Sequence, residues 1–76
     1  MKLQELVESL EEIVMVDNGT ISMGTKLDEL EEWDSLAQIA LLSVLEEKIG
    51  VKLTITALMD AKTFSDIVEL VKDHLQ

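Results

Sequence analysis

Residues 33–50 read WDSLAQIALLSVLEEKIG, and this stretch decides the fold. Ser35 is followed three residues later by Gln38, the capping-box spacing in which each side chain satisfies a backbone N–H that lacks a partner inside the helix. Gly50 then supplies a residue that tolerates the left-handed conformation at which many helices end. The pattern predicts a helix from Ser35 to about Ile49.

This helix has two contrasting faces when its residues are placed about 100° apart around the axis. One face gathers the residues expected in the core, namely Ala37, Leu41, Leu42, Val44, Leu45 and Ile49. The opposite face mixes apolar residues with acids and consists of Leu36, Ile39, Ala40, Ser43, Glu46 and Glu47. Either a neighbouring loop buries Leu36 and Ile39, or this face docks a protein partner, with apolar anchors and with carboxylates that attract a basic surface.

The chain before this stretch predicts one further helix and a long loop. Apolar residues recur at three-and-four spacing from Leu3 to Val14, with Glu5, Glu8, Glu11 and Glu12 mostly on the solvent side. This helix is expected to end near Asp17-Asn18-Gly19, where Asn and Gly favour a turn. From Thr20 to about Trp33 we expect a loop attached to the core by Ile21, Met23, Leu27 and Leu30.

The chain after this stretch predicts a connector and two more helices. Val51, Leu53 and Ile55 alternate with polar residues, but no second strand is present to pair with them, so we expect an extended connector leading to a short helical turn around Ala57 to Ala61. A last helix is expected after Thr63, an N-cap with Asp66 three residues on. The expected fold is all-α: a small four-helix bundle of three main helices and one short one, forming a single domain over residues 1–76.

Composition excludes several classes of function. The chain has 76 residues, with 16 Asp and Glu against 6 Lys and Arg, giving a formal net charge of -10 at pH 7. Such a charge repels nucleic acid and favours basic protein surfaces. With no cysteine and one histidine, His74, neither a metal site nor a catalytic residue is expected, so the chain is not expected to be an enzyme. The apolar runs are too short to span a bilayer, and a cytoplasmic monomer without membrane contact is expected.

Asp34-Ser35-Leu36 at a helix start resembles the signature of the acyl carrier and peptidyl carrier family. The similarity extends from Leu27 to Val71 through an acidic loop, a Leu/Val-rich helix ending in Leu-Glu-Glu, a Gly-Val-x-Leu connector and a final Thr-Phe-x-Asp-Ile-Val helix. The resemblance implies an acyl-carrier-like fold and a covalent 4'-phosphopantetheine arm on Ser35. It also implies that Asp34 contacts the phosphopantetheinyl transferase and its Mg²⁺.

The resemblance further implies a carrier that holds acyl or aminoacyl groups as thioesters and presents them to partner enzymes. Those partners are the transferase and loading or acyl-transfer enzymes with basic docking surfaces. The residues expected to bind them, called the docking stripe below, are Leu36, Ile39, Ser43, Glu46 and Glu47. The residues expected to steer them, called the acidic loop below, are Asp28, Glu29, Glu31, Glu32 and Asp34. Because Glu32 and Trp33 stand where fatty-acid-synthesis carriers usually have Gly and a small residue, the chain looks more like the stand-alone carriers of specialised pathways.

Two other functions compete with the carrier interpretation. The first is an unmodified acidic helical adaptor that binds proteins through the face from Leu36 to Glu47. The second is a small acid-catalysing enzyme built on paired carboxylates, which fails because the chain offers neither a cleft nor a positioned base. Trp33 is expected to pack over the start of the Ser35 helix. The residues expected to fill gaps in the core are Met15, Met23 and Met59.

Overall fold

Four α-helices form the fold in the computed structural model, which describes residues 1–76. They are α1 (Leu3–Ile13), α2 (Ser35–Ile49), α3 (Ile55–Asp60) and α4 (Phe64–Val71), with single 3-10 turns η1 (Leu27–Glu29) and η2 (Lys72–His74). The backbone forms no strand, only an isolated antiparallel bridge between Lys26 and Thr63. The predicted all-α bundle of three main helices and one short one is confirmed.

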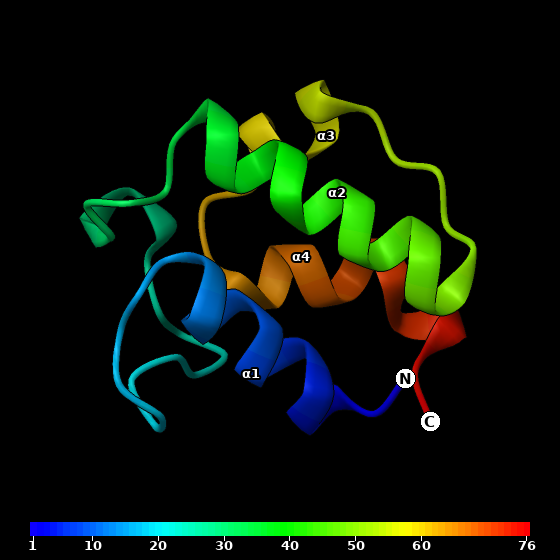
Figure 1. The fold of residues 1–76 in the computed structure, drawn as a ribbon, viewed down its shortest axis with the longest axis horizontal. Coiled ribbons are helices and arrows are strands. Elements are labelled where there is room, and N and C mark those ends of the chain that lie inside the picture. Colours follow the sequence, from blue (N-terminus) through cyan, green and yellow to red (C-terminus); the bar gives the residue numbers. More distant parts are fainter.

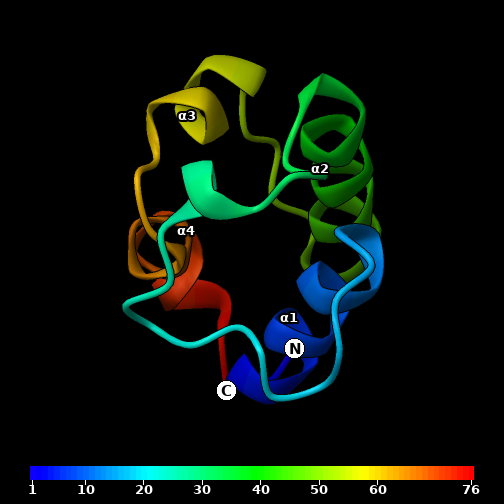
Figure 2. The same ribbon diagram turned by 90° about the vertical axis from the view of Figure 1, so that its left-hand side faces the viewer.

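The helices surround one core. In Figure 1, α2 crosses the upper part of the molecule, with α4 behind its lower edge and α1 below. In Figure 2, α1 and α2 lie on one side of the bundle and α3 and α4 on the other. The buried apolar side chains are Leu6, Leu10, Val14, Ile21, Leu27, Ala37, Leu41, Leu45, Leu58, Phe64, Ile67 and Val71. None of the helices has both the length and the apolar character needed to cross a membrane.

Both predicted ends of α2 are confirmed, but the residue that caps its start is not the predicted one. Gly50 ends the helix with a φ of 69°, a left-handed conformation that costs glycine little. At the start, Oδ1 of Asp34 accepts a hydrogen bond from the backbone N–H of Ala37 at 3.0 Å. The predicted capping box of Ser35 and Gln38 is therefore wrong, because the Asp34 carboxylate, on an extended backbone, already occupies the mouth of the helix.

Helix α1 ends earlier than predicted. Its last residue is Ile13, not a residue near Asp17-Asn18-Gly19. The cause is Glu11, which was expected on the solvent side but is only 1% exposed. Its Oε2 accepts hydrogen bonds from the backbone N–H groups of Gly19 at 2.8 Å and Ile21 at 3.1 Å. By binding these two donors, the carboxylate holds the following loop against the end of α1, so the chain turns back instead of continuing as a helix.

The loop between α1 and α2 is fastened to the start of α4. The backbone N–H of Leu27 donates to the carbonyl oxygen of Lys62 at 2.9 Å, and that of Phe64 donates to the carbonyl oxygen of Thr25 at 3.0 Å. A third bond, 3.1 Å long, joins the Ser65 N–H to the Met23 carbonyl oxygen. The predicted attachment of the loop through apolar side chains holds for the buried Ile21 and Leu27 and the half-buried Leu30. The Met23 side chain, by contrast, is exposed.

The predictions for the remaining parts hold with small shifts. The connector leads into α3 at Ile55, two residues earlier than expected, and Thr54 caps it by accepting a bond from the Ala57 N–H at 3.2 Å. The Thr63 and Asp66 cap at the start of α4 is confirmed.

The expectation that Met15, Met23 and Met59 fill the core is wrong, because all three side chains are exposed. The buried volume is already filled by Leu, Ile, Val and Phe.

Candidate functional site

Ser35 occupies the first position of α2, where its side chain is exposed to solvent. Its hydroxyl forms no hydrogen bond within the protein, and the backbone N–H groups of Ser35 and Leu36 have no acceptor. The N-terminus of a helix carries roughly half a positive charge from the aligned peptide dipoles. The start of α2 therefore offers a free hydroxyl beside backbone donors that favour an anionic group such as a phosphate.

Asp34 holds this helix start in place. Its carboxylate is the N-cap of α2, and the residue as a whole remains exposed. Because only one hydrogen bond, to the Ala37 N–H, engages the carboxylate, its second oxygen is free to bind a cation or a partner. Asp34 therefore combines a structural role at the backbone with an unused charged atom beside the Ser35 hydroxyl.

The docking stripe lies on the outer face of α2. Leu36 is 77% exposed and Ile39 is 52% exposed, so no loop covers them. Further along the helix the exposed members are Ser43, Glu46 and Glu47. The alternative interpretation, in which the long loop buries Leu36 and Ile39, is wrong. Large apolar side chains in water beside carboxylates are typical of a protein-binding surface.

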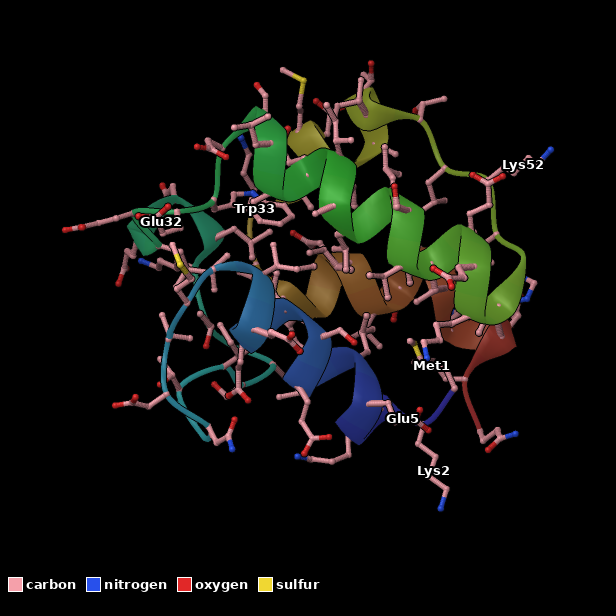
Figure 3. All side chains as sticks on the ribbon, in the orientation of Figure 1. Met1, Lys2, Glu5, Glu32, Trp33 and Lys52 are labelled. Atoms are coloured by element: carbon pink, nitrogen blue, oxygen red, sulfur yellow. The ribbon has the colours of Figure 1, made fainter.

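The acidic loop precedes this face and carries no compensating positive charge. Its members Asp28, Glu29, Glu31 and Glu32 are all exposed, and Figure 3 labels Glu32 on the loop at the left edge of the molecule. The only ion pair in the structure joins Lys72 to Glu69 at 3.1 Å, at the other end of the chain. The negative field around Ser35 is therefore left for a partner to neutralise.

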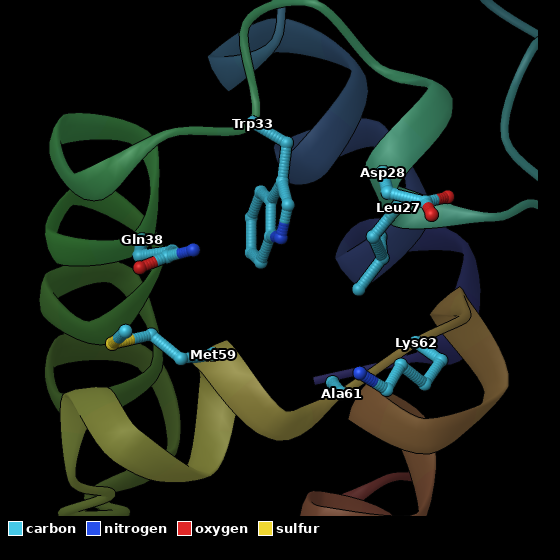
Figure 4. A pocket seen from close by; sticks show the side chains of 7 residues that line it. All are labelled: Leu27, Asp28, Trp33, Gln38, Met59, Ala61 and Lys62. Atoms are coloured by element: carbon cyan, nitrogen blue, oxygen red, sulfur yellow. The ribbon is translucent and has the colours of Figure 1, made fainter.

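Trp33 lies over a groove next to the start of α2. The residue is half-buried, as expected for an indole that packs over the helix, and its ring points inward from the loop (Figure 3). The groove has a volume of about 370 Å³. Its lining residues are Leu27, Asp28, Trp33, Gln38, Met59, Ala61 and Lys62 (Figure 4). The spacing between Ser35 and Gln38 indicated a capping role, so the position of Gln38 in this groove was not predicted.

Comparison with known families agrees with this geometry. The family model described as "Phosphopantetheine attachment site" matches residues 4–71. The chain belongs to the phosphopantetheine-binding carrier family. No curated protein and no solved structure gives a match.

Membership of this family establishes the general role of the protein. It is a phosphopantetheine carrier, with 4'-phosphopantetheine attached covalently to a serine. Carrier domains of this family are not catalytic themselves, and they interact with phosphopantetheinyl transferases and acyl-handling enzymes. The structure contains no cluster of His, Cys, Asp and Glu side chains that could hold a metal ion.

Proposed function

We propose that the protein carries acyl or aminoacyl groups as thioesters on an arm attached to Ser35 and presents them to the enzymes of a biosynthetic pathway. The observation that supports this most directly is the exposed, unbonded Ser35 hydroxyl at the first position of α2. The same proposal takes residues 1–76 as a single carrier domain that acts as a monomer in the cytoplasm.

The other serines are poorer candidates for the attachment. The Ser9 hydroxyl donates to the Glu5 carbonyl oxygen at 2.8 Å, and Ser22 lies 3.2 Å from the Thr25 hydroxyl. Ser43 is exposed in the middle of α2, where the backbone N–H groups are already used within the helix. Ser65 is half-buried in α4. Ser35 alone combines exposure, a free hydroxyl and neighbouring backbone donors.

The residues around Ser35 fit the phosphate end of a phosphopantetheine arm. The unpaired N–H groups of Ser35 and Leu36 can donate to phosphate oxygens, and the helix dipole favours their charge. Asp34, whose second carboxylate oxygen is unused, is suited to contact the transferase and its Mg²⁺ during attachment. The bound arm supplies the thiol that forms the thioester, a group that this cysteine-free chain lacks.

The docking stripe and the acidic loop together suit partners with basic surfaces. Leu36 and Ile39 supply apolar area that a partner would bury, while Glu46 and Glu47 attract positive charge over a longer range. The partners proposed are the phosphopantetheinyl transferase and acyl- or aminoacyl-loading and acyl-transfer enzymes. Exposed apolar residues alone would also suit an adaptor, but an unmodified adaptor does not fit the phosphopantetheine attachment that the family match shows.

Intact-mass measurement tests Ser35 as the attachment residue. After incubation with coenzyme A, Mg²⁺ and a broad-specificity transferase, the wild type is expected to gain the mass of one phosphopantetheine group. Ser35→Ala should gain nothing, while Ser43→Ala, which removes another exposed hydroxyl from the same helix, should be loaded like the wild type. If the wild type stays unmodified with several transferases, or if Ser35→Ala is still loaded, the carrier proposal on Ser35 is wrong.

A further inference from the structure

Gln38 is a buried polar residue without a partner in the protein. It is only 8% exposed, yet its side-chain amide forms no hydrogen bond with any other residue. Buried amides are normally paired, because leaving them unpaired costs free energy. No fully enclosed polar side-chain atom in the structure lacks a partner, so the amide of Gln38 must be open to the groove that it lines.

The groove around Gln38 has a mixed lining. Figure 4 shows the Gln38 side chain reaching from α2 toward the Trp33 indole, with Met59 of α3 below them. Lys62 and Asp28 lie on the far side from α2. An alkyl chain would leave the Gln38 amide unsatisfied and would end against charged residues, so the lining favours a ligand that carries hydrogen-bonding groups.

Gln38 lies close to the proposed attachment atom. Ser35 and Gln38 are three residues apart on α2, and residues with this spacing are neighbours on a helix surface. The rise along the axis between them is about 4.5 Å. Unless an arm attached to Ser35 folds back on itself, only the part of that arm close to Ser35 lies within reach of Gln38.

We propose that Gln38 anchors the phosphopantetheine arm by hydrogen bonding to one of its amide groups, so that the arm lies in the groove beneath Trp33. This inference rests on the proposed function, because it assumes attachment at Ser35. An amide could also be supplied by the cargo at the end of the arm. The short distance along α2 favours the arm, and Gln38 is thus a positioning residue that sets where the thioester end emerges.

Chemical tethering tests this proposal without the transferase. Because the chain has no cysteine, Ser35→Cys introduces a single thiol that methanethiosulfonate reagents convert to a mixed disulfide, with methanesulfinate as the leaving group. Three probes of equal length are attached: a plain alkyl chain, a chain with an amide near the tether, and a chain with an amide only at its far end. Trp33, the sole tryptophan in a chain without tyrosine, reports groove occupancy by fluorescence, and the side-chain amide signals of Gln38 report hydrogen bonding by NMR.

The near-amide probe is expected to shift the Gln38 amide signals and the Trp33 emission, and the alkyl probe to leave the Gln38 signals in place. In the Ser35→Cys background, Gln38→Met should lower groove occupancy by the near-amide probe about 3- to 10-fold, the range expected for one neutral hydrogen bond. Gln4→Met, a matched change on the exposed face of α1, should lower it not at all.

Three outcomes would overturn the proposal: a larger Gln38 shift with the far-amide probe, equal shifts with all probes, or no shift with any. The first would assign Gln38 to the cargo instead of the arm. The probes are attached without an enzyme, so the tethering experiment is independent of the transferase assay. If no transferase modifies the wild type, the proposed function fails, and the role of Gln38 is still decided by the probe signals.

Discussion

The first turn of α2 and the first turn of α4 satisfy their backbones in related ways, but they place their side chains in opposite environments. An aspartate carboxylate accepts backbone N–H bonds at both starts: Asp34 from the first turn of α2, and Asp66 from the residues just before α4. Yet Leu36 is 77% exposed, whereas Phe64 is fully buried. The cap alone does not decide whether the side chain that follows it is buried, so the exposure at α2 has a different origin, which we propose is partner binding.

The largest expected effect is on stability, and it comes from truncating one side chain in the first turn of each helix. Phe64→Ala should lower the free energy of unfolding by about 3–5 kcal/mol, because it leaves a cavity in the core. Leu36→Ala should change it by less than about 0.5 kcal/mol, as for other surface positions. Loading and acyl transfer should nevertheless slow in Leu36→Ala, since we propose this side chain as an anchor for partners.

Urea unfolding and transfer rates measure the two effects separately. If Phe64→Ala fails to fold, Ile67→Val provides a milder core change, with an expected loss of about 0.5–1.5 kcal/mol. A loss of several kcal/mol in Leu36→Ala, or a normal transfer rate in that variant, would contradict the contrast between the two helix starts.

The second prediction separates the two roles of Asp34. Asp34→Ala removes the cap and should cost about 0.5–2 kcal/mol of stability. Asp34→Asn keeps an oxygen that can accept the Ala37 N–H bond and should remain within a few tenths of a kcal/mol of the wild type. Both variants should be loaded about tenfold or more slowly, because both lose the charged contact that we propose with the transferase and its Mg²⁺. Normal loading of Asp34→Asn would leave Asp34 with the capping role alone.

The third prediction follows the exposed face of α2 beyond its first turn. The double variant Glu46→Lys/Glu47→Lys should associate several-fold more slowly with a basic partner enzyme. Glu8→Lys/Glu12→Lys, the same charge change on the exposed side of α1, is the control and should have a smaller effect. Association of the wild type should weaken toward physiological ionic strength, where the Debye length is about 8 Å, while the melting temperature rises as repulsion is screened. Equal rates for the two double variants would show that no particular face is used.

The smallest expected effect is on how stability changes with pH in the acid range. Hydrogen bonds from the backbone N–H of Lys62, and secondly of Thr63, lower the pKa of the Asp66 carboxyl. A carboxyl whose pKa is lower in the folded than in the unfolded state stabilises the fold above the unfolded value, and that contribution is lost as the pH falls through the folded value.

At pH values above about 5, Asp66→Asn should therefore have a slightly lower melting temperature than the wild type. The difference between the two proteins should shrink as the pH is lowered. Asp60→Asn removes a similar exposed charge, and Asp60 accepts no backbone bond in the structure, so it serves as the control. A difference that stays constant with pH would mean that the Asp66 cap does not depend on its charge.

Much of this contrast between helices could be predicted from spacing. Capping patterns located the starts of α2 and α4, and Gly50 located the end of α2. The cap of α2 was misplaced by one residue because Asp and Ser are both good N-caps, and only the backbone angles of Asp34 decide between them. The wheel separated the faces of α2 correctly at Leu41 and Leu45, which are fully buried.

Features that depend on long-range contacts could not be predicted. Glu11 looked like a solvated acid because its two bonding partners, Gly19 and Ile21, come from a loop whose path no local pattern specifies. The burial of Gln38 depends on where Trp33 and α3 pack, which spacing within α2 does not reveal. That the Gln38 amide opens only to the groove becomes visible only when the whole bundle is assembled.

The hydrogen bonds that fasten the long loop to the start of α4 bear on the order in which the protein folds. They join Met23, Thr25 and Leu27 to residues 62–65, from the opposite half of the chain. Contacts between distant positions must overcome a larger loop-closure entropy than the contacts within a helix. During synthesis, α2 can therefore form while the loop is still unfastened. The wall of the groove that contains Leu27 closes only after the last third of the chain has emerged, so we expect a nascent chain to expose Ser35 before it can hold an arm.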